Sequence, residues 1–309
     1  MIEPRLEYVV CASPGGVHRM VYWEWGDPHN DRVLVCVHGL TRCGRDFDEL
    51  AQRLAARYRV VCPDVVGRGR SDWLVDPAFY TVPQYISDML TLIARLNVQQ
   101  VDWLGTSMGG LVGLGLAGAL AASAARRPQR GRYGLPAQSA VRLGKMVLND
   151  VGPRLNAQGL TRIAEYVGRE VFFDTFDDAV TYVQSVSAGF GPHSLAQWRR
   201  LTRDVFLQQD DGRWAKHYDT RLAQPLGLKD TQTLQSAELL LWAAYDSIDS
   251  PVQVLRGRES DVLTQETAHE MIKRNKHAQL LEFSGVGHAP TLLTDEQIGP
   301  IVQFLCGSD

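Results

Sequence analysis

Residues 101–111 read VDWLGTSMGGL, and this stretch decides the fold. The apolar run that ends at Leu104 predicts a buried strand, and the glycine-rich run after Ser107 predicts a helix. Gly105 and Gly109 frame the serine in a G-x-S-x-G pattern. A strand that turns sharply into a helix leaves no space for side chains beside the turn, and the glycines supply that space. The serine is then held in a strained conformation at a helix N-terminus, where N–H groups favour developing negative charge. The pattern predicts a nucleophilic serine.

Length and composition limit the class of protein. A chain of 309 residues holds one large domain, or one domain with an inserted subdomain. Hydrophobic and charged contents of 45% and 22% are those of a soluble globular protein. The net charge of -3 argues against a nucleic-acid partner. Residues 1–5 show no signal-peptide pattern, and we expect no apolar run long enough to cross a membrane. We therefore expect no membrane partner.

The cysteines give a prediction about compartment. They are five in number and scattered, and no C-x-x-C pair occurs: Cys11, Cys36, Cys43, Cys62 and Cys306. Free buried thiols in a reducing cytoplasm explain this distribution, so we predict a cytoplasmic protein. A structural zinc site is not expected.

Apolar runs and helical periodicity alternate over the first half of the chain and return near its end. The predicted strands cover residues 6–11, 20–25, 32–37, 60–63, 101–104, 145–149, 252–256 and 280–283. Alternating strands and helices predict a parallel sheet with helices on both faces, an α/β fold. Ligands of such sheets lie at the carboxyl ends of the strands. His38 and Gly39, the loop 64–72 and Ser107 all fall at such ends.

The strand rhythm disappears between Pro153 and about Asp246. Residues 155–171, 176–186 and 195–207 have helical spacing and many aromatic side chains. We predict a helical cap, residues 153–246, inserted after the sixth strand into a core formed by residues 1–152 and 247–309. A lid of this kind excludes water and shapes a pocket. The Arg-, Pro- and Gly-rich residues 126–138 are interpreted as a solvated loop in preference to an anion-binding patch.

A nucleophilic serine needs a base, and the base needs a group that fixes its tautomer. His288 follows the last predicted strand in a loop that allows close approach to Ser107, and we predict it as general base and then general acid. Asp261 follows the previous strand and is predicted to orient His288. Asp150, which also follows a strand, is the main rival for that role, and Glu259 is a weaker one. Asp261 is preferred because its loop directly precedes the His288 unit.

An oxyanion intermediate needs hydrogen-bond donors. We predict the backbone N–H groups of Met108, directly after the nucleophile, and of Leu40, after His38 and Gly39. His38 is interpreted as a support for that loop rather than as the base. The other six histidines are interpreted as surface or structural residues.

In their order and separation, these landmarks resemble the capped enzymes of the α/β-hydrolase fold. The resemblance rests on residues 38–40, 64–71 and 105–110, on Asp261 and on His288. It implies an eight-stranded, mostly parallel sheet with helices on both faces, and neither a metal nor an organic cofactor. A serine at the elbow argues against haloalkane dehalogenases and epoxide hydrolases of this fold, which use aspartate there.

The expected function is hydrolysis of a small to medium carboxylic ester through an acyl-enzyme on Ser107. The resemblance also reaches hydrolases of short hydroxyalkanoate esters and oligomers. One alternative is a carbon–carbon bond hydrolase of ring-cleavage products, in which Arg42 is a candidate to bind the substrate carboxylate. Another is a non-enzymatic small-molecule sensor on the same scaffold. Acyl transfer, the physiological substrate and a homo-oligomeric state are left open.

Overall fold

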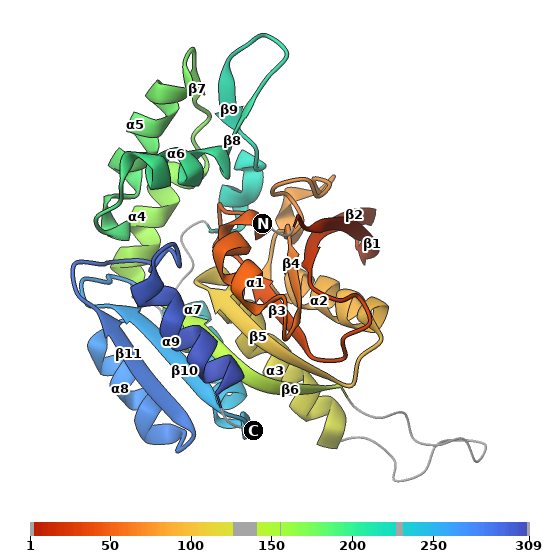
Figure 1. Ribbon diagram of the computed structural model, residues 1–309. Helices are drawn as coiled ribbons and strands as arrows, with labels where there is room; N and C mark the ends of the chain where they lie inside the picture. Colours follow the sequence, from red (N-terminus) through yellow and green to blue (C-terminus); the bar gives the residue numbers. More distant parts are fainter. Residues whose placement is uncertain (1–2, 126–140, 155, 227–230, 308–309) are drawn as a thin grey trace.

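The structure is a computed structural model that describes residues 3–125, 141–154, 156–226 and 231–307. Eight strands form one sheet in the order β1-β2-β4-β3-β5-β6-β10-β11 (Figure 1). The strands are β1 (Arg5–Ser13), β2 (Gly16–Trp25), β3 (Val33–Val37), β4 (Arg59–Pro63), β5 (Gln100–Thr106), β6 (Arg142–Asn149), β10 (Val252–Gly257) and β11 (Ala278–Phe283). β2 runs antiparallel to β1 and to β4, and the other neighbours are parallel. The predicted eight-stranded, mostly parallel sheet is confirmed.

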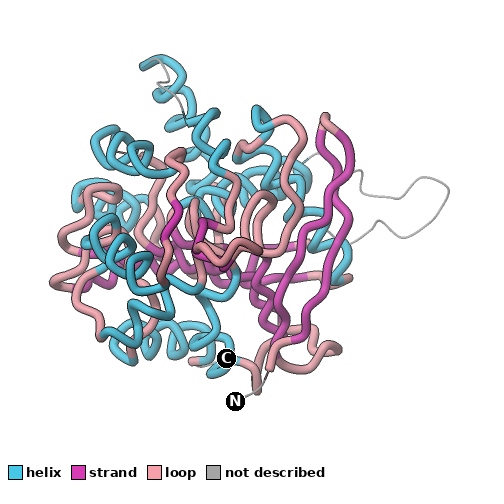
Figure 2. Tube along the Cα trace, turned by 90° about the horizontal axis from the view of Figure 1, so that it is seen from above, coloured by secondary structure: helices cyan, strands magenta, loops and turns pink. Residues whose placement is uncertain are grey.

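Helices cover both faces of the sheet, as Figure 2 shows from above. α1 (Asp48–Leu54) and α9 (Asp295–Cys306) pack on one face. The other face carries α2 (Val82–Leu96), α3 (Met108–Ala125), α7 (Thr231–Asp246) and α8 (Gln265–Arg274). The central strand β3 is buried throughout and sends alternate side chains into the two cores. A strand covered on both faces reads as a continuous apolar run, which is why the sequence revealed it.

Helix α3 corrects one expectation. Its 18 residues are long and apolar enough to cross a membrane, by length and composition alone. In the fold, α3 lies against β5, α2 and α7. A Cβ atom on Gly113 would lie 2.3 Å from Nε1 of Trp103, so this helix packs closely on the sheet. Its apolar composition is explained by that packing in the core.

Residues 156–226 lie above the carboxyl edge of the sheet, and we call them the overlying segment (Figure 1). They include α4 (Ala157–Val167), α5 (Phe176–Val186) and α6 (Leu195–Arg203). They also form a small antiparallel sheet of β7 (Phe172–Phe173), β9 (Trp214–Lys216) and β8 (Phe206–Gln208), in that order, which the sequence did not predict. Strands of two or three residues are too short to show alternation.

The helix that follows this segment belongs to a different layer. α7 packs against α3 on one face of the sheet, although its residues fall inside the predicted cap. The part of the chain above the sheet therefore ends before α7, and not at residue 246. The predicted solvated loop 126–138 lies outside the described residues.

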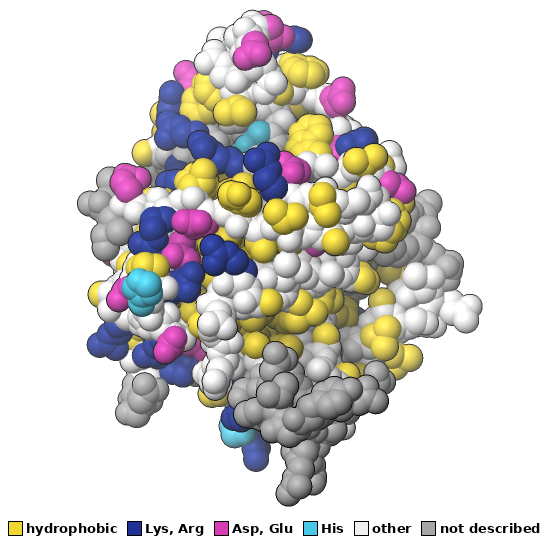
Figure 3. Space-filling model, turned by 90° about the vertical axis from the view of Figure 1, so that its right-hand side faces the viewer, with side chains coloured by type: hydrophobic (Ala, Val, Ile, Leu, Met, Phe, Trp, Pro, Cys, Tyr) yellow, Lys and Arg dark blue, Asp and Glu magenta, His cyan; other side chains and the backbone are white. Residues whose placement is uncertain are grey.

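All five cysteines are free, and four of them are buried, as the sequence predicted. The surface near the β1–β2 hairpin is chemically mixed. Figure 3 shows this side, where Lys and Arg side chains lie among Asp, Glu and hydrophobic side chains. Three apolar side chains of the edge strand β1 are exposed: Leu6, Tyr8 and Val10.

Candidate active site

Ser107 lies in the turn between β5 and α3. Its φ is +51°, in the left-handed region, and its N–H donates a hydrogen bond to the Asn149 carbonyl at 2.9 Å. A Cβ atom on Gly105 would lie 2.3 Å from the Gly109 carbonyl oxygen, and one on Gly109 would lie 2.0 Å from the Val37 carbonyl oxygen. Side chains at these two positions would collide with the backbone. The strained turn expected from the sequence is therefore present.

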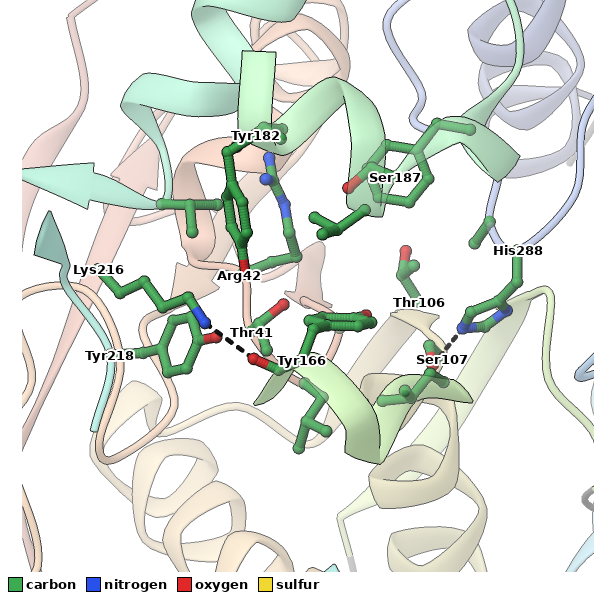
Figure 4. Close-up of a pocket in the computed structure, with 18 of the residues that line it drawn as sticks. Thr41, Arg42, Thr106, Ser107, Tyr166, Tyr182, Ser187, Lys216, Tyr218 and His288 are labelled. Atoms are coloured by element: carbon green, nitrogen blue, oxygen red, sulfur yellow. Dashed lines mark hydrogen bonds between the residues drawn. The ribbon is translucent and has the colours of Figure 1, made fainter. Parts of the chain in front are cut away.

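His288 lies on the loop after β11, and its side chain is 9% exposed. Its Nε2 atom is 2.8 Å from Ser107 Oγ (Figure 4). The Glu259 carboxylate accepts hydrogen bonds from the N–H groups of Gly285 at 3.1 Å and Val286 at 2.9 Å. These bonds lower the pKa of Glu259. Glu259 was a weak rival for contact with His288, and it instead holds the loop that carries His288.

Asp150 directly follows β6 and is the carboxylate that meets His288. Its Oδ2 lies 2.7 Å from His288 Nδ1 and accepts from Ser260 Oγ at 2.5 Å. Its Oδ1 accepts from the Gly257 N–H at 2.9 Å. The side chain is fully buried. An ionised carboxylate only accepts hydrogen bonds, so Nδ1 of His288 carries a proton and Nε2 is left to accept one from Ser107.

Asp261 does not contact His288, and this corrects the prediction. Its carboxylate binds Arg162 of α4, through Nε at 2.6 Å and Nη2 at 2.8 Å, and this pairing lowers its pKa. Its side chain is 34% exposed. The Ser260 N–H bonds the Gly257 carbonyl in a tight turn, in which Ser260 faces Asp150 and the next residue faces α4.

The register of the sheet explains why Asp150, and not Asp261, meets His288. Asn149 is in register with Thr106 across β5 and β6, so the residue after Asn149 lies beside Ser107 at the same sheet edge. Asp261 lies after β10, one strand further from β5. Lateral distance in the sheet decides the contact, and closeness along the chain to His288 does not.

The predicted oxyanion donors lie at the same edge. In the described part of the chain, neither the Leu40 nor the Met108 N–H has a hydrogen-bond acceptor. His38 is fully buried, and burial lowers its pKa to about 3. Its Nε2 accepts from the Val65 N–H at 3.0 Å, so Nδ1 donates to the Gly39 carbonyl at 2.7 Å. A neutral His38 therefore supports the Leu40 loop.

Arg68 is a site residue that the sequence reasoning missed. Its side chain is fully buried. Nε donates to the Leu40 carbonyl at 2.9 Å, and Nη2 lies 3.3 Å from Met108 Sδ. Its guanidinium carbon lies 4.8 Å from the ring centroid of Tyr85. One cation thus fixes both residues whose N–H groups are predicted to bind the oxyanion. Only its place in the loop 64–72 pointed to it.

A pocket opens between the sheet edge and the overlying segment, as seen in Figure 4. Ser107 and His288 line one part of it, and Tyr182, Lys216 and other residues of the overlying segment line the rest. Arg42 also lines it, but its guanidinium bonds both oxygens of Asp46 and the Leu201 carbonyl. The positive charge of Arg42 is therefore already neutralised.

Comparison with known proteins places the chain in a family. Residues 34–298 match the model of the "Alpha/beta hydrolase family". A 3-hydroxybutyrate-oligomer hydrolase from Cupriavidus necator is 50% identical over 309 residues, which cover 99% of each chain. The solved structure of an alpha/beta hydrolase from Novosphingobium aromaticivorans is 33% identical, with a TM-score of 0.82 and 99% of each chain covered. E-2-(acetamidomethylene)succinate hydrolase, at 17% identity and a TM-score of 0.73 over 98% of this chain and all of that one, shares the fold. This chain is a hydrolase and belongs to the alpha/beta hydrolase family.

Proposed function

We propose that this protein is a serine hydrolase that cleaves short oligomers of 3-hydroxybutyrate, or closely similar hydroxyalkanoate esters, through an acyl-enzyme on Ser107. The observation that carries the proposal is the chain of hydrogen bonds from Ser107 Oγ through His288 to Asp150. A serine hydroxyl beside the acceptor nitrogen of a histidine, held by a buried carboxylate, is the arrangement that activates serine as a nucleophile.

The first half of the reaction forms the acyl-enzyme. His288 Nε2 takes the Ser107 hydroxyl proton as Oγ attacks the ester carbonyl carbon. The oxyanion that forms accepts hydrogen bonds from the N–H groups of Leu40 and Met108. When the intermediate collapses, the bond to the alcohol oxygen breaks, and His288 gives its proton to that oxygen. Asp150 stabilises the imidazolium between these two steps.

The second half releases the acid. Water enters, His288 takes one of its protons, and the oxygen attacks the acyl carbon. Collapse of this intermediate breaks the bond to Ser107 Oγ, which recovers its proton from His288. The cycle uses only water and the ester, and it leaves the protein unchanged.

The substrate class rests on the relative from Cupriavidus necator, which is named as a 3-hydroxybutyrate-oligomer hydrolase and is half identical over nearly the whole chain. For the alternative of a carbon–carbon bond hydrolase, Arg42 was the candidate to bind the substrate carboxylate, and its guanidinium is already engaged by Asp46. We place the reaction in the cytoplasm as part of the proposal, which the five free cysteines support.

The test is hydrolysis of p-nitrophenyl esters of increasing acyl length and of 3-hydroxybutyrate dimer and trimer, by the wild type and by Ser107→Ala. We expect release from short acyl chains and from both oligomers, with a loss of about 10⁴-fold or more in kcat for the variant. An unchanged melting temperature would show that the variant is folded. Turnover that survives in Ser107→Ala would disprove the serine mechanism, and a folded wild type inert toward every ester would favour carbon–carbon substrates or a sensor.

A further inference from the structure

Lys216, at the end of β9, lies in the pocket away from the reacting groups. Figure 4 shows its side chain on the opposite side of the view from His288, with Tyr182 and Tyr218 nearby. Its Nζ atom is 5.7 Å from the ring centroid of Tyr182 and 5.3 Å from that of Tyr218. Lys216, Tyr182 and Tyr218 take no part in the reaction described above, so this end of the pocket is available for another part of the substrate.

The ammonium of Lys216 has two partners, and both are neutral. Nζ donates to the carbonyl oxygens of Tyr166 and Arg169, each at 2.8 Å. An ammonium has three N–H donors, so one is left over. In the described part of the chain, no carboxylate forms an ion pair with Lys216, and the charged group that acts on it is another cation, Arg169. A partly buried cation without a counter-charge favours an anionic ligand.

The charge of the pocket lining points the same way. Among the described lining residues, Arg42 and Lys216 are cationic and none is acidic. Arg42 is neutralised by Asp46. Of the two described lining cations, Lys216 is therefore the one without a carboxylate partner. Tyr182 adds a donor, because its hydroxyl is buried and has no hydrogen-bond partner among the described residues. Its side chain points into the pocket in Figure 4.

The chemistry of the proposed substrate supplies an anion at a fixed place. An oligomer of a hydroxy acid has one free carboxylate, at the end opposite its free hydroxyl. Whichever ester bond is cut, that carboxylate belongs to the departing alcohol fragment and never to the acyl fragment on the serine. An anion site in the pocket beyond the serine therefore binds the leaving group.

We propose that Lys216, with the Tyr182 hydroxyl, forms a carboxylate subsite that binds the free acid end of the oligomer and so directs cleavage to an ester bond near that end. The proposal rests on the proposed function, because it takes the oligomer as substrate. It makes Lys216 a specificity residue, distinct from the groups that perform the reaction.

A structural role for Lys216 has to be separated from this one. Its two carbonyl partners lie at the end of α4, where a lysine also stabilises a helix C-terminus. Lys216→Gln keeps a hydrogen-bond donor for these carbonyls and removes the charge. Lys216→Arg keeps the charge. A structural role affects all substrates equally, whereas a carboxylate subsite distinguishes acidic from neutral ones.

The experiment compares the 3-hydroxybutyrate dimer with the same dimer carrying a carboxamide in place of the carboxylate. For the wild type we expect kcat/KM to be about tenfold to a hundredfold higher for the acid, mainly through KM, as for a lost hydrogen bond to a charged group. Lys216→Gln lowers the value for the acid to that for the carboxamide and leaves the carboxamide within about twofold, while Lys216→Arg keeps most of the preference. Equal rates for the two dimers in the wild type, or an equal loss for both in Lys216→Gln, would overturn the proposal.

A binding measurement separates this proposal from the proposed reaction. Calorimetric titration of Ser107→Ala with each dimer needs no turnover. We expect the acid to bind about tenfold more tightly than the carboxamide, and the double variant Ser107→Ala, Lys216→Gln to lose this difference. Lys216-dependent binding without wild-type turnover would disprove the reaction and support the subsite. Turnover without any difference in binding would disprove the subsite and support the reaction.

Discussion

The carboxyl edge of the sheet and the overlying segment hold their pocket side chains in different ways. At the edge, Ser107 and Asp150 are fixed by backbone contacts between adjacent strands and by the turns that end them. In the overlying segment, Lys216 and Tyr182 extend from a three-residue strand and a short helix, and their polar atoms have few partners or none. The edge is determined by strand topology, and the segment by local packing.

This difference separates reaction from substrate choice. Groups fixed by the sheet meet every substrate in the same geometry, so changes at the edge lower the rates of acidic and neutral esters together. Lys216 and Tyr182 in the overlying segment are proposed to contact only the free acid end of the substrate. Changes there alter the ratio between substrates, and the predictions below test that division.

After the loss of Ser107 itself, the largest effect is expected at Asp150. Asp150→Asn keeps the size of the side chain but removes the charge that stabilises the His288 imidazolium and fixes its tautomer, so we expect kcat to fall by about 10³–10⁴-fold for acidic and neutral esters alike. The matched control is Asp261→Asn, which breaks a partly exposed ion pair with Arg162. Its expected change in kcat is less than about threefold, and its change in unfolding free energy is within about 1 kcal/mol.

The pair of variants decides between the two carboxylates in one experiment, with kcat and the melting temperature measured for each. A large loss of kcat in Asp261→Asn beside a mild one in Asp150→Asn would restore the assignment made from the sequence. Equal losses would mean that neither carboxylate alone orients His288.

The same two carboxylates show which features of the site can be predicted from the sequence and which cannot. The succession of strands along the chain, the strained turn at Ser107 and the position of His288 after the last strand could be predicted, because glycine spacing and apolar runs are local signals. The choice between Asp150 and Asp261 needed the lateral order of β6 and β10, which arises from pairing between distant segments. Asp261, which is nearer to His288 along the chain, was the wrong residue for that reason.

The pocket was harder to predict than the edge. The two- and three-residue strands β7, β8 and β9 have no detectable period, so the position of Lys216 in the pocket could not be inferred. Arg68 was equally hidden, because a guanidinium that is fully buried against a carbonyl, a thioether and an aromatic ring has no sequence signature. The predicted cap extended too far, to residue 246, because α7 is helical like the helices before it.

A smaller effect is expected at Arg68. Arg68→Met keeps much of the buried stem but removes the contacts to the Leu40 carbonyl and to Met108. Loss of one oxyanion donor costs about 10²–10³ in kcat, and Arg68 acts through the residues that carry the donors. We therefore expect kcat to fall about 10- to 100-fold with KM nearly unchanged, equally for the acidic and the carboxamide dimer.

The control for Arg68 is Arg68→Lys, which keeps the charge but not the planar fork that reaches both residues. It should lose kcat to a similar extent. Unfolding free energies measured beside the kinetics identify any loss that comes from instability. A rise in KM at constant kcat would contradict a role in holding the oxyanion donors.

The smallest effect is expected in the pH dependence of substrate preference. Burial, and then the like charge of Arg169, lower the pKa of Lys216 to about 8. Below that pH the ammonium is charged, and above it the charge is lost. The ratio of KM for the carboxamide dimer to KM for the acid should therefore be constant between about pH 6.5 and 7.5 and fall several-fold by about pH 9.

The other groups around Lys216 keep their charge states over this range. Burial raises the pKa of the Tyr166, Tyr182 and Tyr218 phenols, so they stay neutral. Burial lowers the pKa of Arg42, but the charge of Asp46 outweighs it and raises that pKa, so Arg42 stays charged. His288 takes the same part in the reaction of both dimers, so the ratio of their KM values does not report on it. Lys216→Gln should give a ratio near one at every pH, and Lys216→Arg a raised ratio that does not fall. A wild-type ratio that stayed constant to pH 9.5, or that fell equally in Lys216→Arg, would mean that another group binds the carboxylate.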